Sequence, residues 1–301
     1  MTSPIWRTSR FAVDLARPRV MGIVNVTPDS FSEGGAAMST ARAIARCEQL
    51  LDEGADLLDI GGESSRPGAL PVSLDDELAR VRPVLAAAVG LGCPVSIDTI
   101  KAEVMRVALD LGVDIVNDIA ALRAPGALEF VAAYDNCGIC LMHMRGTPRS
   151  MQAEPVYEDV VGEVAAFLGQ RIEAAQAAGI DRERIVVDPG IGFGKVPADN
   201  VELLRRQDVL LALGVPLLVG WSRKSTLARL AGLEPAAPAG RSRGEQERLV
   251  AASVAAAVLA VQRGARIVRV HDVAATVAAL AVWHAAGADN RRDPSSDPAR
   301  P

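Results

Sequence analysis

The sequence alternates short runs of β-branched residues with longer segments of helical character, and it does so eight times in 301 residues. Segments such as 39–54 and 158–179 have the length and propensity of amphipathic or alanine-rich helices. Eight consecutive βα units without a break in composition predict one α/β domain, a (β/α)8 TIM barrel with its active site at the carboxyl ends of the strands. A doubly wound open sheet is the alternative. The predicted strands are residues 20–26, 56–62, 94–99, 114–120, 138–144, 184–190, 216–222 and 265–273.

The barrel is expected to occupy residues 18–286, between an N-terminal extension of residues 1–17 and a tail of residues 287–301. The tail is rich in Pro, Asp and Arg and has no apolar face, so we expect it to be disordered. Residues 234–245 form a second irregular stretch, for which the sequence predicts a surface loop but no role.

Composition narrows the classes of partner. Half of the residues are apolar and 23% are charged, which suits a large globular core. A net charge of −5 and an aromatic content of 3% argue against a nucleic-acid-binding surface. The N-terminus lacks the apolar core of a signal peptide, and residues 249–261, the most apolar stretch, are too short to cross a membrane. We therefore expect a cytoplasmic protein without nucleic-acid or membrane partners.

The four cysteines include one close pair, Cys137 and Cys140, with His143 three residues further on. This spacing allows a metal or redox interpretation, but there is no second CxxC to complete a zinc site. Thiols of this kind are more often small buried apolar groups, which fits a reducing compartment. The sequence assigns the pair no role.

The stretch IVVDPGIGFGK, residues 185–195, resembles a phosphate-binding loop at first sight. A Walker A loop needs a glycine five residues before its Gly-Lys and a Ser or Thr directly after it. Here Pro189 and Val196 occupy those positions, so the stretch is not a Walker A loop. It is interpreted as a strand and its following loop, in which Lys195 has no assigned role.

Every predicted strand ends in at least one polar residue, which places a set of polar side chains at the mouth of the barrel. A single polar residue at a strand end is ordinary, because strands run into solvent there. Asp98, Asn117 and Asp188 lie within apolar runs, however, where an unpaired polar side chain is costly. A shared ligand would satisfy them together.

These polar residues sort into two chemical groups. One group mixes donors and acceptors, which suits a flat heterocycle with amide and amine edges: Asp98, Asn117, Asp188 and Lys224. The other consists mostly of donors, which suits a phosphate or pyrophosphate: Asn25, Arg66, Arg269 and His271. Two loops rich in Gly, Ser and Pro, residues 27–35 and 63–69, could fold over such a ligand.

At this point the sequence resembles a known family, the dihydropteroate synthases of folate biosynthesis, over roughly residues 18–285. The resemblance rests on eight segments in register, which makes it highly specific. They are MGIVNVTPDSFSEGG, DIGGESSRPGA, SIDT, VNDI, LMHM, DPGIGFGK, LVGWSRKS and RVHDV.

The resemblance implies a transferase that joins 6-hydroxymethyl-7,8-dihydropterin pyrophosphate to p-aminobenzoate, giving 7,8-dihydropteroate and pyrophosphate. It also implies a homodimer and a Mg²⁺ ion near Asn25. Sulfonamides act on this family as mimics of p-aminobenzoate. Ser65, Ile191 and Trp221 depart from residues common in the family, and these departures bear on inhibitor affinity rather than on the reaction.

The family's contacts transfer onto matching positions of this sequence. Those to the pterin fall on Asp98, Asn117, Met142, Asp188, Phe193 and Lys224. Those to the pyrophosphate fall on Asn25, Arg66, Arg269 and His271. Those to p-aminobenzoate fall on Phe31, Ser65, Arg66, Pro67, Lys224 and Ser225. We also expect Asp59 to bind substrate, and we expect catalytic roles for Asp98, Lys224, Arg269 and His271.

Two other functions remain open on the sequence alone. A methyltetrahydrofolate-dependent methyltransferase would share the barrel and the pterin contacts, but it has no pyrophosphate to hold. A pterin-binding paralogue without synthase activity should have lost loop or anion-binding residues, and none of those named is missing.

Overall fold

The chain forms a closed parallel barrel in a computed structural model that describes residues 4–27, 35–64, 68–146, 156–234 and 240–287. Eight parallel strands follow the order β8-β7-β6-β5-β4-β3-β10-β9, and a bridge between Val187 and Leu217 joins the two ends of that order. The predicted barrel is confirmed, and the open doubly wound sheet is excluded. The strands are β3 (Arg19–Asn25), β4 (Leu57–Gly61), β5 (Val95–Asp98), β6 (Ile115–Asp118), β7 (Gly138–Met142), β8 (Ile185–Asp188), β9 (Leu218–Val219) and β10 (Ile267–Val270).

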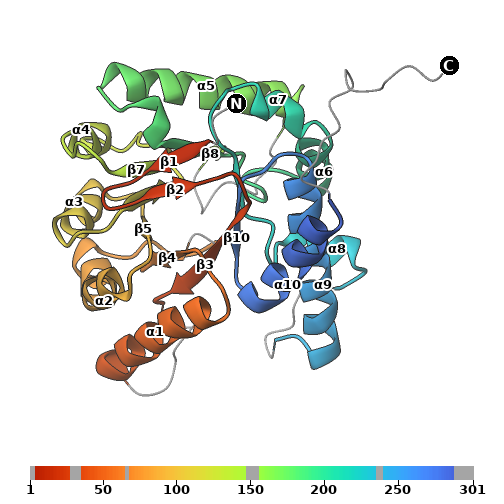
Figure 1. Cartoon of the computed structure of the whole chain (residues 1–301), viewed down its shortest axis with the longest axis horizontal. Helices are drawn as coiled ribbons and strands as arrows, with labels where there is room; N and C mark the ends of the chain where they lie inside the picture. Colours follow the sequence, from red (N-terminus) through yellow and green to blue (C-terminus); the bar gives the residue numbers. More distant parts are fainter. Residues whose placement is uncertain (1–3, 28–34, 65–67, 147–155, 235–239, 288–301) are drawn as a thin grey trace.

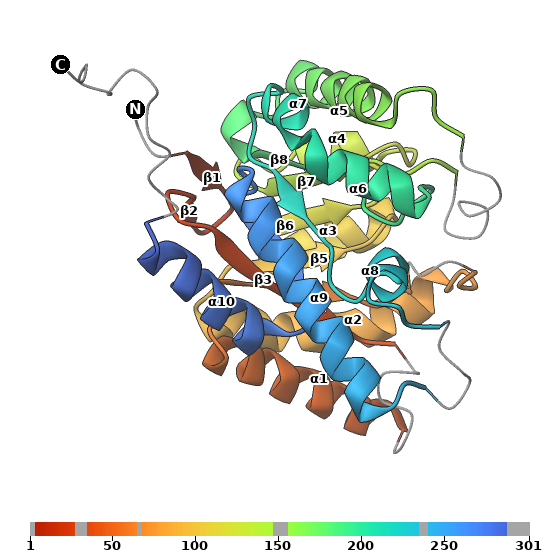
Figure 2. The same cartoon turned by 90° about the vertical axis from the view of Figure 1, so that its right-hand side faces the viewer.

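The helices lie around the outside of the barrel (Figures 1 and 2). Local sequence sets where several begin: Ser242 and Glu245 form a capping box before α9, and Ser73 accepts the N–H of Asp76 before α2. The helices are α1 (Gly35–Asp52), α2 (Leu74–Ala88), α3 (Ala102–Asp110), α4 (Ala127–Ala132), α5 (Val160–Ala177), α6 (Pro197–Arg205), α7 (Gln207–Leu211), α8 (Ser225–Leu230), α9 (Arg243–Gln262) and α10 (Val273–Ala285). None of the helices in the described ranges is long and apolar enough to span a membrane.

A buried layer of inward-facing side chains fills the lower part of the barrel. Most strands contribute one apolar residue to this layer: Met21, Leu57, Ile115, Cys140, Val186, Leu218 and Ile267. Strand residues two apart point to the same face, so the next inward positions toward the carboxyl ends lie directly above it. The apolar layer therefore closes the interior of the barrel from below. The next inward-facing residues on each strand point toward the open carboxyl end of the barrel.

A hairpin of β1 (Ile5–Arg7) and β2 (Ala12–Asp14) closes the other end of the barrel. Trp6 is fully buried against the apolar layer, and its Nε1 donates to the carbonyl oxygen of Arg184 at 2.9 Å. The sequence predicted an extension at residues 1–17 but no strands within it. Most of the predicted tail and part of the loop at 234–245 lie outside the described residues.

The four cysteines are buried free thiols. Burial raises the pKa of Cys137 to about 12, and it also raises the pKa of Cys140, which belongs to the apolar layer. No group of His, Cys, Asp and Glu within the described residues could hold a metal ion. The structure thus gives the Cys137 and Cys140 pair a packing role.

Candidate active site

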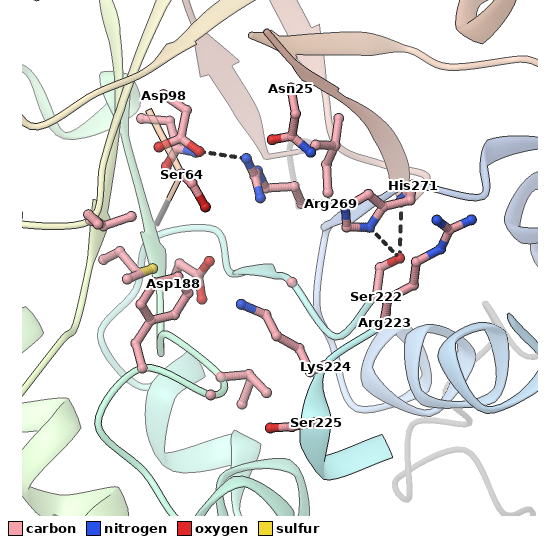
Figure 3. Close-up of a pocket in the computed structure, with 18 of the residues that line it drawn as sticks. Asn25, Ser64, Asp98, Asp188, Ser222, Arg223, Lys224, Ser225, Arg269 and His271 are labelled. Atoms are coloured by element: carbon pink, nitrogen blue, oxygen red, sulfur yellow. Dashed lines mark hydrogen bonds and ion pairs between the residues drawn. The ribbon is translucent and has the colours of Figure 1, made fainter. Parts of the chain in front are cut away.

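A pocket with a volume of about 440 Å³ opens at the carboxyl ends of the strands (Figure 3). Its position follows from the two-residue repeat of the strands. Val186 lies in the apolar layer and Asp188 lines the pocket; Ile267 lies in the layer, and Arg269 and His271 line the pocket. The predicted residues that line it are Asn25, Asp98, Asn117, Met142, Asp188, Phe193, Lys224, Ser225, Arg269 and His271.

Strand register brings predicted residues from different strands to the same level. Asp98 on β5 is the register partner of Asn117 on β6, and Met142 on β7 is the register partner of Asp188 on β8. Residues distant in the sequence therefore form neighbouring pairs around one wall. The predicted residues Phe31, Ser65, Arg66 and Pro67 lie outside the described residues.

Asp59 lies below the pocket rather than in its lining, and it is fully buried. Its Oδ2 accepts hydrogen bonds from Arg269 Nε at 2.5 Å and from Asn117 Nδ2 at 3.2 Å. The predicted substrate-binding residue thus contacts two pocket residues from beneath. Asp59 therefore holds the side chains of Arg269 and Asn117 in place.

Arg269 joins the two chemical groups that the sequence separated. Its Nε contacts Asp59, and its Nη2 donates to Asp98 Oδ2 at 2.6 Å. The neighbouring carboxylates outweigh the effect of burial and raise the pKa of Arg269, so its charge is permanent. Figure 3 shows its guanidinium between Asp98 on one side and Asn25 and His271 on the other. An anion near Asn25 would meet a cation that is already fixed in place.

The two pocket carboxyl groups lie where burial opposes their charge. Burial raises the pKa of Asp98 to about 7, although Arg269 acts in the opposite direction. Burial likewise raises the pKa of Asp188, whose Oδ1 accepts the backbone N–H of Gly190 at 2.7 Å. Burial therefore favours the neutral form of both groups, and Asp98, with a pKa of about 7, can present a carboxylate or a carboxylic acid to the edge of a heterocycle near neutral pH.

Lys224 and Phe193 form a second wall of the pocket. The Lys224 Nζ lies 4.0 Å from the centre of the Phe193 ring, a cation–π contact. Figure 3 shows the Lys224 side chain extending from the start of α8 toward Asp188. A flat ligand between these residues would have an aromatic face, an ammonium and a carboxyl group around it.

Ser222 is a pocket residue that the predicted site set did not include. Its Oγ accepts the backbone N–H of His271 at 3.1 Å and lies 3.0 Å from His271 Nδ1, so it fixes the imidazole. The next residue, Arg223, also lines the pocket, has a left-handed φ of 59° and pairs with Asp272. Both follow β9, so their strand-end position was the available signal. Further lining residues outside the predicted set are Ile23, Thr27, Ser64, Ile119, Ile191, Gly192 and Gly220.

Comparison with known proteins identifies the family. The model of the pterin binding enzyme family matches residues 21–271. A dihydropteroate synthase of Neisseria meningitidis serogroup C is 51% identical over 95% of this chain and 99% of its own.

Two solved structures show the same fold. Xanthomonas albilineans dihydropteroate synthase in complex with 7,8-dihydropteroate is 49% identical, with a TM-score of 0.83 over 94% of this chain and 99% of its own. Yersinia pestis dihydropteroate synthase with a sulfonamide drug complex is 43% identical, with a TM-score of 0.85 over the same shares. The chain therefore belongs to the pterin binding enzyme family and, within it, to the dihydropteroate synthases.

Proposed function

We propose that this chain condenses 6-hydroxymethyl-7,8-dihydropterin pyrophosphate with p-aminobenzoate, releasing pyrophosphate and forming 7,8-dihydropteroate. One observation carries the proposal: a single pocket holds a wall of mixed donors and acceptors beside a wall of donors, and Arg269 links the two. A pterin joined to a pyrophosphate has the same two-part chemistry. The methyltransferase alternative leaves the donor wall without a ligand.

The wall of Asp98, Asn117 and Asp188 is assigned to the pterin ring. Carboxylates accept from the amine and ring N–H groups of a pterin, and the Asn117 amide can both donate and accept. Asp59 holds the Asn117 amide nitrogen, which fixes the direction in which its oxygen points. If the C–O bond to the pyrophosphate breaks early, the nearby carboxylates also stabilise the positive charge that develops on the pterin methylene.

The wall of Asn25, Arg269 and His271 is assigned to the pyrophosphate. Arg269 is held by two carboxylates and His271 by Ser222, so both donors are in place before the ligand binds. Pre-positioned donors stabilise the negative charge of the leaving group without reorganising during the reaction. Arg66, which lies outside the described residues, is assigned to the same anion.

Asn25 also fits the binding of a Mg²⁺ ion that the pyrophosphate holds in part. Asn25 contributes a carboxamide oxygen to the pocket lining beside the proposed anion position. Mg²⁺ is commonly held by one or two protein oxygens, water and substrate phosphates rather than by a full protein cage. When bound, the ion would neutralise part of the leaving group's charge.

The p-aminobenzoate is assigned to the outer part of the pocket, next to Lys224 and Ser225. An aryl amine is a nucleophile at neutral pH, so it needs positioning against the pterin methylene more than a strong base. Phe31, Ser65 and Pro67, the remaining residues of this assignment, lie outside the described residues.

We also propose that the protein is a homodimer in the cytoplasm. Helices α9 and α10 lie side by side on one flank of the barrel (Figure 2), where Leu259 and Val282 are exposed apolar side chains. Four free cysteines fit a reducing compartment. Light scattering on the purified protein and fractionation of producing cells test these two points; a monomer or a secreted protein would contradict them.

The deciding experiment is a product assay. Purified protein is incubated with the dihydropterin pyrophosphate, p-aminobenzoate and Mg²⁺, and 7,8-dihydropteroate is measured by chromatography. We expect product in the complete mixture and a marked loss after chelation with EDTA that added Mg²⁺ restores. Absence of product under conditions in which a control synthase works would refute the proposed activity, and full activity in EDTA would refute the magnesium role.

A further inference from the structure

Lysine is rare in this chain, and its placement is uneven. Only three of the 32 Lys and Arg residues are lysines: Lys101, Lys195 and Lys224. Each follows the carboxyl end of a strand, namely β5, β8 and β9. An ammonium directs three donors from one atom, whereas a guanidinium is a planar fork. Lys224 lines the pocket and Lys101 forms ion pairs with Glu63 and Glu77, whereas Lys195 is buried outside the pocket lining.

Lys195 is almost fully buried, with 2% of its surface exposed. Its Nζ donates to the carbonyl oxygens of Gly190 and Phe193, each at 3.1 Å, and lies 3.4 Å from that of His143. The His143 Nδ1 lies 2.8 Å away. Burial lowers the pKa of His143 to about 3, so this imidazole is neutral and can accept. Burial also lowers the pKa of Lys195, to about 7, and its Nζ carries N–H donors in either protonation state. The described partners of Lys195 are thus carbonyl groups and a neutral ring.

These partners belong to two segments that Lys195 holds together. The loop that follows β8 turns through Gly190, Gly192 and Gly194, all of which have φ between 63° and 80°. A Cβ on Gly190 would lie 1.9 Å from the carbonyl oxygen of His143, and one on Gly194 would lie 2.5 Å from that of Arg145. The glycines therefore let the loop press against the segment after β7. Lys195 binds the carbonyl groups that this approach brings together.

The same loop contacts one residue of the pterin wall and contains another. The N–H of Gly190 donates to Asp188 Oδ1, and the Phe193 side chain lines the pocket beneath Lys224. The carbonyl groups of Gly190 and Phe193 are the two that Lys195 holds at 3.1 Å. A displacement of either peptide would move Asp188 or the Phe193 ring.

We propose that Lys195 is a positioning residue for the pterin half of the site: its side-chain amino group fixes the loop of residues 189–194 so that Asp188 and Phe193 meet the bound pterin. Lys195 does not line the pocket and so acts through these two residues. The inference rests on the proposed function for the identity of the ligand. Loss of the amino group should weaken pterin binding and leave pyrophosphate binding intact.

Arg184 supplies a matched control at the other end of β8. It is also 2% exposed, and it donates to the carbonyl oxygens of Cys137 and Tyr134, each at 2.7 Å. Replacing either side chain by Met therefore leaves buried carbonyl groups without donors, before β7 in one variant and in the loop after β8 in the other. A general loss of stability should appear in both variants, whereas a positioning effect should appear only in Lys195→Met.

The test measures binding of 6-hydroxymethylpterin and of inorganic pyrophosphate by isothermal titration calorimetry. We expect Lys195→Met to weaken pterin binding by about tenfold, the typical effect of leaving a buried acceptor unsatisfied, and to change pyrophosphate binding by less than about twofold. Arg184→Met should lower the melting temperature and leave both affinities unchanged. Lys195→Gln keeps an amide NH₂ donor group on a neutral side chain and provides the measurement if Lys195→Met does not fold.

A double-mutant cycle separates positioning from general destabilisation. If Lys195 acts through Phe193, the losses of pterin affinity in Lys195→Met and Phe193→Leu should not multiply in the double variant. A folded Lys195 variant that binds pterin like the wild type, or losses that multiply fully, would overturn the proposal. This experiment measures binding and not turnover. If the wild-type protein made no dihydropteroate, the proposed activity would be refuted, but the binding measurements would still test the role of Lys195.

Discussion

The buried polar groups at the two ends of the barrel differ in what they face. At the amino-terminal end, Trp6 and Arg184 donate to backbone carbonyl groups, and the β1–β2 hairpin covers the apolar layer. At the carboxyl-terminal end, Asp98 and Asp188 are buried carboxyl groups that face a pocket, and burial raises the pKa of each. The first end satisfies its polar groups within the chain, whereas the second keeps polar groups that a ligand can satisfy.

The comparison places stabilising contacts at the amino-terminal ends of the strands and ligand-facing groups at their carboxyl ends. A site that holds charges away from water lowers stability, and the closed end offsets that loss by burying a large aromatic residue. Substitutions at the two ends should therefore have separable effects.

The largest effect is expected from Arg269→Ala at the mouth. The substitution leaves the buried carboxyl groups of Asp59 and Asp98 without their cation, and breaking a buried ion pair typically costs about 3–5 kcal/mol of unfolding free energy. It also removes a fixed donor from the leaving group, so kcat should fall by about 10²–10³-fold. Denaturant unfolding and the product assay measure the two effects. Normal turnover in a folded variant would show that this end does not need Arg269.

At the closed end, Trp6→Ala should lower stability without changing the site. Removing this fully buried side chain leaves a cavity beneath the apolar layer and is expected to cost about 3–5 kcal/mol. The KM values for both substrates should stay within about twofold of the wild type, because the hairpin does not reach the pocket. Steady-state kinetics well below the melting temperature provide the test; a selective rise in the pterin KM would break the proposed separation.

A pH-dependent effect on stability is expected from Asp98. Burial raises its pKa from 3.8 to about 7, so the folded state binds this proton more tightly than the unfolded state. The associated stabilisation is present below pH 3.8 and is lost as the pH rises through about 7. Asp98→Asn removes this pH dependence. The melting temperature of the variant minus that of the wild type should therefore be higher at pH 8 than at pH 5.

The matched control for this prediction is Asp75→Asn on the exposed face of α2. Its melting temperature relative to the wild type should be the same at both pH values. If the difference in melting temperature between Asp98→Asn and the wild type were also the same at both pH values, it would contradict the assigned effect of burial on the pKa of this carboxyl group.

The smallest effect is expected from Cys137→Ala. The thiol is buried and free, so its loss should cost about 1 kcal/mol in packing and leave product formation unchanged. Chemical unfolding and the product assay measure both quantities. An activity loss that exceeds the loss of folded protein would restore a chemical role for the Cys137 and Cys140 pair.

The eight barrel strands could be predicted because their β-branched runs are separated by clear helical patterns. Strand β9 is much shorter than the predicted 216–222, since Pro216 lacks an N–H for a strand ladder and Leu217 contributes only an isolated bridge. The three-residue strands β1 and β2 were missed because segments this short carry little periodic signal.

The site was predicted as a set of residue types, but not as a set of contacts. The pairing of Asp59 with Arg269 and Asn117 depends on strand register, which a single sequence does not display. Lys195 remained without a role because its partners are mostly backbone carbonyl groups, which leave no residue pattern. Its function becomes visible only when the loop of glycines is folded against the segment after β7.

The most direct test of the account is a crystal structure of the protein with 6-hydroxymethyl-7,8-dihydropterin pyrophosphate, Mg²⁺ and no p-aminobenzoate. We expect the pterin ring against Asp98, Asn117 and Asp188, with Phe193 beside it, and the pyrophosphate between Asn25 and His271. A ligand bound away from the mouth of the barrel, or with its pyrophosphate against Asp188, would contradict the central claim.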